Sequence, residues 1–232
     1  MSDAALEIQA LHKTFTLHAQ SGVRLPVLRG VSLRVAPGEC VVLADPSGSG
    51  KSTLLRAVYG NYLPQAGRIL VRHENRVVDL VGASPRLLLD VRRHTIGYVS
   101  QFLRVVPRVP VVDVVAEPLR ALGVPLTEAR ERARALLDRL RIPERLWPLS
   151  PVTFSGGEQQ RVNVARVFVA DYPVLLLDEP TASLDAESRD LVVELIDEAR
   201  GRGAAVLGTV HDAAVRGRLA TRVQRLTEPA AA

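Results

Sequence analysis

The stretch Asp45-Pro46-Ser47-Gly48-Ser49-Gly50-Lys51-Ser52-Thr53 follows the apolar run 40–44 and precedes a helical pattern. Small residues let successive backbone N–H groups turn toward an anion, Lys51 supplies a positive charge for the outer phosphates, and the Ser52 hydroxyl can hold Mg²⁺. A helix over 53–59 would direct its positive N-terminal end at the same phosphates. The sequence therefore predicts a site for a nucleoside triphosphate, formed by Ser47, Gly48, Ser49, Gly50, Lys51, Ser52 and Thr53.

Position 45 departs from the usual Gly-x-x-x-x-Gly-Lys-Ser/Thr pattern, because Asp45 replaces the first glycine. A carboxylate about 6 Å from a phosphate would oppose binding by up to roughly 3 kcal/mol per phosphate charge at an effective dielectric near 20. On that reading the chain could be a nucleotide-binding scaffold that barely hydrolyses. The alternative is that Asp45 points to solvent or pairs with a nearby arginine, in which case the loop binds ATP normally.

The composition is that of a globular chain with one substantial core: 232 residues, 47% of them hydrophobic. Cys40 is the lone cysteine, which excludes an internal disulfide. Residues 1–10 lack the basic start and apolar stretch of a signal peptide, and no apolar run approaches the length of a membrane span. We expect a cytoplasmic protein without direct membrane insertion.

The net charge of +5 is carried almost wholly by arginine, since Lys13 and Lys51 are the only lysines. A basic balance can suit nucleic acid, an anionic membrane face or an acidic protein. The arginines of 130–141 alternate with Glu131 and Asp138, as on a solvated helix, and aromatic residues make up only 4% of the chain. We therefore expect no nucleic-acid partner.

Short apolar segments alternate with helical patterns, which is typical of an α/β fold. From about 102 to 170 the chain is mainly helical, with Ala129, Ala133 and Leu137 among the residues of one apolar stripe over 127–140. A further helix is expected over about 185–200. The expected strands cover residues 6–10, 31–35, 40–44, 68–72, 77–81, 96–99, 174–177 and 204–208.

A second chemical element is the pair Asp178-Glu179 at the end of the apolar run 174–177. In a nucleotide site, Asp178 would bind Mg²⁺ directly or through water, and Glu179 could polarise the water that attacks the γ-phosphate. An Asp-Glu pair after a strand is often no more than a charged turn, but the phosphate-binding loop makes the catalytic interpretation the better one.

The third element is Ser155-Gly156-Gly157-Glu158-Gln159, where Ser155 can cap a helix and the glycines leave N–H groups uncovered. This pentapeptide is the signature sequence of ATP-binding-cassette ATPases. Four further elements resemble that family in the correct order, over about 6–226: Phe15 as the aromatic that stacks on adenine, Gln101 as the Q-loop glutamine, 183–185 as the D-loop ending in Asp185, and His211 as the switch histidine.

The resemblance implies a P-loop NTPase of the ABC ATPase type. It would form a single domain over 1–232, with a RecA-like α/β core, an N-terminal antiparallel β portion and an inserted α-helical signature subdomain at about 102–170. It implies ATP and Mg²⁺ as cofactors, with Ser52, Gln101 and Asp178 toward the metal and Glu179, His211 and Gln101 in catalysis. Two subunits, identical or paralogous, would enclose ATP between the phosphate loop of one and Ser155, Gly156, Gly157 and Asp185 of the other.

Segments outside the catalytic motifs, among them 61–64, 143–147 and 153–163, resemble the L-component (PhnL) family of the bacterial carbon-phosphorus lyase system. This resemblance implies an ATPase that assists a phosphonate lyase core complex. The rival interpretation is the ATPase subunit of a membrane transporter, similar to the lipoprotein-release and macrolide-export subunits, which would dock to a permease through the surface around 101–110.

Overall fold

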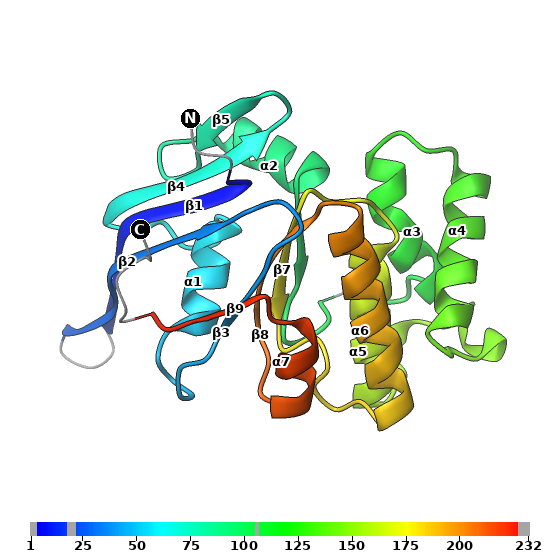
Figure 1. Ribbon diagram of the computed structural model, residues 1–232. Helices are drawn as coiled ribbons and strands as arrows, with labels where there is room; N and C mark the ends of the chain where they lie inside the picture. The colour runs from blue at the N-terminus through cyan, green and yellow to red at the C-terminus, as the bar shows by residue number, and fades with distance from the viewer. Residues whose placement is uncertain (1–3, 18–21, 105–106, 227–232) are drawn as a thin grey trace.

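The computed structural model describes residues 4–17, 22–104 and 107–226 (Figure 1). Within these ranges five parallel strands form the central sheet, in the order β6-β7-β8-β3-β9. Continuous apolar runs of this kind suit strands that are covered on both faces. The strands are β3 (Cys40–Leu43), β6 (Ile96–Val99), β7 (Val174–Asp178), β8 (Ala205–Thr209) and β9 (Arg222–Gln224).

Side chains alternate across the central sheet with the period of two that a strand imposes. Val174 and Leu176 of β7 belong to the core beneath helix α1 (Lys51–Val58) and the second sheet. Leu175 and Leu177 belong to the core on the opposite face, which is covered by helices. The sheet therefore separates two apolar cores, and the loops at the carboxyl ends of its strands lie at a shared edge, where α/β proteins bind ligands.

A second sheet, again within the described residues, is antiparallel, with the order β2-β1-β4-β5. Its strands are β1 (Leu6–Leu17), β2 (Val23–Val35), β4 (Ala66–His73) and β5 (Arg76–Asp79). Figure 1 shows this sheet at the upper left, with α1 between it and the central sheet. This is the expected N-terminal antiparallel portion, and the α/β cassette architecture predicted from the sequence is confirmed.

Strand β1 continues to Leu17, beyond the predicted end at residue 10. A bulge interrupts the alternation of its side chains, so the sequence pattern predicted only the first part of the strand. Ala10 has a φ of 43°, and the pairing with β2 shifts between Ile8 and Leu11. A bulge inserts one extra residue and re-aims the side chains that follow. Gly67 permits this approach, since a Cβ there would lie 2.5 Å from the Ala10 carbonyl oxygen. The strand then continues to Leu17 and carries Phe15.

The helices of the second half cover the other face of the central sheet, on the right in Figure 1. The stretch 102–170 contains α3 (Val111–Ala121), α4 (Leu126–Arg139), two short 3-10 turns, η2 (Glu144–Leu146) and η3 (Pro151–Thr153), and α5 (Gly156–Phe168). That this stretch acts as a separate subdomain stays a prediction. The remaining helices are α2 (Pro85–His94), α6 (Ala186–Gly201) and α7 (Ala213–Leu219). No helix in the described ranges combines the length and apolar character needed to cross a bilayer.

Candidate nucleotide-binding site

The phosphate-loop candidate joins the end of β3 to the start of α1, as the sequence predicts. Gly48 and Gly50 have φ values of 81° and 102°, which glycine adopts at low cost. Only glycine fits at position 50, because a Cβ would lie 2.7 Å from Val27 Cγ1. Lys51 is 8% exposed, and its Nζ donates to the carbonyl oxygens of Asp45 at 2.5 Å and Pro46 at 2.8 Å. Its charge is therefore held inside the loop.

Asp45 turns away from this loop interior. Its Oδ2 accepts a hydrogen bond of 2.9 Å from the backbone N–H of Leu226, and the neighbouring Ala44 N–H donates to Gln224 O at 3.1 Å. The carboxylate is therefore engaged by a backbone amide. The repulsion argument required a carboxylate facing the phosphates, and this geometry removes its premise.

Asp178 ends β7 and is 1% exposed, so its charge needs several hydrogen bonds. Ser52 Oγ donates to Oδ1 at 2.9 Å, and Thr209 Oγ1 donates to the same oxygen at 3.2 Å. The Tyr98 hydroxyl donates to Oδ2 at 3.3 Å. Burial, followed by the Asp178 charge, raises the pKa of Tyr98 to about 12, so this hydroxyl keeps its proton at neutral pH. The structure thus brings two of the three expected metal-side residues, Ser52 and Asp178, into contact.

Glu179 and His211 also meet, although they were predicted separately. His211 Nε2 lies 2.8 Å from Glu179 Oε1, and the glutamate side chain is 25% exposed. Glu179 has a φ of 56°, a conformation that costs a residue with a side chain about 1–3 kcal/mol. It is held by its own N–H, which donates to Thr209 Oγ1 at 3.0 Å, and by Gln160 Nε2, which donates to its carbonyl oxygen at 3.2 Å. Strain fixed in this way is typical of a functional site.

Gln101 lies in the loop after β6 and lines the pocket described below. The preceding Ser100 is fixed, since its carbonyl oxygen accepts from Asn163 Nδ2 of α5 at 2.5 Å. Among the described residues no hydrogen bond joins the Gln101 side chain to Asp178 or Glu179. The expected metal contact of Gln101 stays a prediction.

Phe15 is half-buried on β1, where its ring meets the edge of Tyr62 with the centroids 5.2 Å apart. Lys13 Nζ lies 5.0 Å from the centroid of the same ring. These contacts fix the ring on the antiparallel sheet, but they do not join it to the phosphate loop. Its role against adenine stays a prediction.

The signature sequence begins helix α5 in a capping box. Ser155 Oγ accepts from the Glu158 N–H at 3.3 Å, and the Ser155 N–H donates to Glu158 Oε2 at 2.9 Å. The same Ser155 hydroxyl lowers the pKa of Glu158. A Cβ at Gly157 would lie 3.0 Å from the Ser183 carbonyl oxygen, so the signature packs closely on the D-loop candidate of its own chain. Asp185 then caps α6 through the Ser188 N–H at 2.7 Å.

In the part of the chain that the structure describes, no hydrogen bond or ion pair joins the signature or Asp185 to the phosphate loop. Within one chain the structure therefore assembles the loop with Asp178, Glu179 and His211, and it leaves Ser155, Gly156 and Gly157 apart from them. Two contributors went unnoticed in the sequence, namely Tyr98 and Thr209. Thr209 had a signal, because it ends the strand next to β7 and pairs directly with Asp178.

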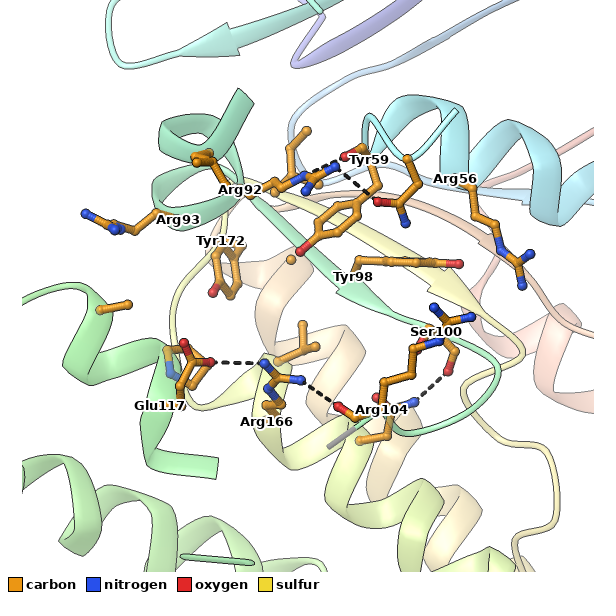
Figure 2. Close-up of a pocket in the computed structure, with 18 of the residues that line it drawn as sticks. Arg56, Tyr59, Arg92, Arg93, Tyr98, Ser100, Arg104, Glu117, Arg166 and Tyr172 are labelled. Carbon is orange, nitrogen blue, oxygen red and sulfur yellow. Dashed lines mark hydrogen bonds and ion pairs between the residues drawn. The ribbon is translucent and has the colours of Figure 1, made fainter. Parts of the chain in front are cut away.

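A pocket of about 720 Å³ lies beside Gln101, between α2, β6, α3 and α5 (Figure 2). Its lining is strongly basic, and we call it the basic groove. In Figure 2, Arg92 lies against Tyr59, with its guanidinium 4.6 Å from the ring centroid, and Arg166 pairs with Glu117 at 3.1 Å. Glu117 is the one carboxylate among the described lining residues, against the five arginines Arg56, Arg92, Arg93, Arg104 and Arg166.

Comparison with known proteins agrees with this geometry. The family model described as "ABC transporter" matches residues 28–182. The chain therefore belongs to the ABC transporter ATP-binding family. It is 42% identical to the lipoprotein-releasing system ATP-binding protein LolD of Maricaulis maris, over 94% of this chain and 93% of the relative. The LolD of Hyphomonas neptunium is 38% identical over 93% of this chain and 91% of the relative.

Among solved structures, the chain resembles the dimeric structure of MJ0796, a bacterial ABC transporter cassette. The TM-score is 0.85 at 28% identity, with 95% of this chain and 93% of that chain covered. The post-hydrolysis dimer of the same cassette bound to ADP and Pi matches equally well, with a TM-score of 0.85. Family membership supports ATP binding and hydrolysis, and the dimeric cassette supports a dimer.

The assignment to the carbon-phosphorus lyase branch is wrong. The similar curated relatives are LolD proteins, and nothing supports PhnL, a role in phosphonate metabolism or a lyase core partner. Residues that suggested that branch have packing roles here. Asn61 Oδ1 accepts from Arg92 at 3.1 Å, and Trp147 Nε1 donates to Ile142 O at 2.9 Å. Both hydrogen bonds lie within the chain, so they do not by themselves identify a partner.

Proposed function

We propose that this chain is the ATP-hydrolysing subunit of a membrane transporter of the lipoprotein-release type. The transporter part rests on similarity to LolD proteins over more than nine-tenths of both chains. The enzymatic part rests on one observation, the contact of His211 with Glu179 beside the contact of Ser52 with Asp178. The transporter interpretation, which was the alternative in the sequence analysis, replaces the lyase interpretation.

In this proposal the loop residues Ser47 to Thr53 bind the phosphates of ATP, and Phe15 stacks on adenine. The hard oxygens of Ser52 and Asp178 fit Mg²⁺, which prefers such ligands, and bound Mg²⁺ would neutralise charge on the phosphates. Gln101 would complete the metal side from the loop after β6. Glu179 acts as the general base toward water, and His211 orients its carboxylate.

We further propose that two chains share each nucleotide. Ser155, Gly156, Gly157 and Asp185 would serve the ATP held by the partner's phosphate loop, since no hydrogen bond or ion pair within the described ranges joins them to the loop of their own chain. The uncovered N–H groups at the start of α5 suit a phosphate. The chain thus has the parts of two half-sites, which fits a head-to-tail dimer.

The permease would dock on the basic groove. Five arginines and one glutamate, Glu117, give the groove a positive charge that favours an acidic segment of the permease. The exposed side chains of Leu89 and Phe102 offer that segment apolar contacts. The groove borders Gln101, so an occupant would lie next to the proposed metal side of the site.

Purification of the tagged chain from native membranes in mild detergent tests the proposal. We expect an integral permease to copurify, and we expect Arg93→Glu with Arg104→Glu to release it at an unchanged thermal midpoint. Arg29→Glu, an exposed arginine outside the groove, is the matched control and should retain the permease. Recovery of soluble partners alone, with no integral membrane protein, would contradict the transporter assignment.

A further inference from the structure

A cluster of potential metal ligands lies on the opposite side of α2 from the basic groove. It consists of His73 at the end of β4, Glu74 in the turn to β5, and Asp90 on α2. One donor atom of each residue lies within 4.8 Å of the others. None of these residues contacts the nucleotide site, and the proposed function does not use them.

His73 anchors the cluster, because its ring is fully buried and fixed at both nitrogens. Nδ1 lies 2.7 Å from Thr95 Oγ1, and Nε2 lies 3.0 Å from Asp90 Oδ2. When Nδ1–H donates to the threonine hydroxyl, the Nε2 lone pair is directed at the carboxylate. Metal-ligating histidines usually have their second nitrogen bonded in this way, which fixes the tautomer and the ring.

A fourth donor stands at the other side of Asp90. His94 Nδ1 lies 3.0 Å from Asp90 Oδ1, one helical turn along α2. Two imidazoles therefore flank the Asp90 carboxylate, and the exposed Glu74 adjoins His73 and Asp90 from the turn. Nitrogen and oxygen ligands of this kind suit Zn²⁺, at about 2.0–2.2 Å from the ion. A ligand set that contains imidazole nitrogens suits Mg²⁺ less well, because Mg²⁺ prefers oxygen ligands.

We propose that His73, Glu74 and Asp90, with His94 beside them, form a binding site for Zn²⁺ or a similar divalent transition-metal ion. The ion takes the place of the proton between His73 Nε2 and Asp90, the neutral ring carries its proton on Nδ1 toward Thr95 Oγ1, and the exposed Glu74 carboxylate is drawn in. It joins the β4–β5 turn to α2. The opposite face of α2 carries Leu89, Arg92 and Arg93 into the basic groove, at the i, i+3 and i+4 spacing of one helix face. The bound ion therefore braces one wall of that groove.

The test is calorimetric titration of the untagged full-length chain with ZnSO₄, together with thermal unfolding with and without the metal. We expect one Zn²⁺ per chain and a higher midpoint for unfolding. Asp90→Asn and Glu74→Gln should each weaken binding by at least about 10-fold and reduce the midpoint shift. Thr95→Val keeps the shape but removes the hydroxyl, and its Zn²⁺ affinity should fall by about 10- to 100-fold. Co²⁺ should give the visible absorption of a four-coordinate site.

Two controls separate this cluster from other ligands. His12→Gln removes an exposed histidine elsewhere and should leave the affinity unchanged. His211→Ala removes the histidine of the nucleotide site and should also bind Zn²⁺ normally. Binding that is lost in His211→Ala but retained in Glu74→Gln and Asp90→Asn would overturn the proposal, as would the absence of any titration by the unmodified chain. Glu74 is exposed, so Glu74→Gln decides the matter even if substitutions at His73 unfold the chain.

Discussion

His211 Nε2 lies 2.8 Å from Glu179 Oε1, and each residue follows closely on one of two neighbouring parallel strands, β8 and β7. The register of these strands, in which Asp178 pairs with Thr209, determines this contact. Two central strands of the sheet therefore position the candidate base, Glu179, although Glu179 and His211 themselves lie in loops at the carboxyl edge of the sheet.

Replacing the candidate base tests the chemistry directly. We expect Glu179→Gln to lower ATP turnover by about 10²- to 10⁴-fold, because the amide cannot take a proton from the attacking water. Binding should persist, so the variant should accumulate as an ATP-bound dimer in size-exclusion chromatography. Glu131→Gln, an exposed glutamate on α4, serves as the control for phosphate release. Unchanged turnover in Glu179→Gln would remove this residue from the mechanism.

The shared-site proposal predicts complementation between two inactive chains. Lys51→Ala damages the phosphate loop, and Ser155→Arg blocks the signature. A mixed dimer retains one composite site with neither change, so we expect a mixture to recover phosphate release that each variant lacks alone. Mixed pairing should be verified with two different affinity tags. No recovery despite verified pairing would mean that both sites must work together or that the sites are not shared.

Asp45→Gly should leave ATP affinity nearly unchanged and lower stability. The carboxylate accepts the Leu226 N–H, and loss of a hydrogen bond to a charged group costs about 1.5–3 kcal/mol of unfolding free energy. Asp45→Asn keeps an acceptor oxygen and should lose less. Denaturant unfolding measures the loss of stability, and titration with Mg-ATP at two salt concentrations measures the ATP affinity. Tighter binding by the glycine variant, with a gap that narrows at high salt, would restore the repulsion argument.

Gly50→Ala should abolish ATP binding, because the new Cβ would lie 2.7 Å from Val27 Cγ1 and 3.2 Å from Val27 O. Gly123→Ala is the matched control, since Gly123 also has positive φ, 87°, but has no atom within 4 Å of its Cβ position. Both variants should lose about 1–3 kcal/mol from backbone strain. Only the first should lose nucleotide binding in calorimetric titration. Normal binding by Gly50→Ala would mean that the loop can shift away from β2.

The elements that were predicted well have strong local signals. The strands at 40–43 and 174–178 are uninterrupted apolar runs, and the Gly-Lys-Ser-Thr and Ser-Gly-Gly motifs mark helix starts. Helix α2, helix α7 and strand β9 were not predicted. Strand β9 has only three residues and an exposed Val223, so its pairing with β3, and not its composition, makes it a strand.

The chemical role of a residue could be predicted more reliably than the direction in which its side chain points. Ser52 and Asp178 were predicted to lie on the metal side of one site, and the hydrogen bond between them follows from a loop and a strand end at one sheet edge. The direction of the Asp45 carboxylate depends on the Leu226 N–H, which is 181 residues away in sequence. No local pattern contains that information. The branch of the family was also mistaken, because segments around residues such as Asn61 and Trp147, which make hydrogen bonds within the chain, were used to assign it.

The pairing of β3 has a consequence for the order in which the molecule can form during synthesis. Within the described residues β3 pairs only with β8 and β9, so the strand that leads into the phosphate loop is synthesised more than 160 residues before either of its neighbours and must wait for them. The antiparallel sheet can close from residues 6–79, but the central one must wait for residues 205–224. Until then Cys40 and Val42, which face the helices of the second half, remain uncovered in the nascent chain, and a chaperone has most to protect in that interval.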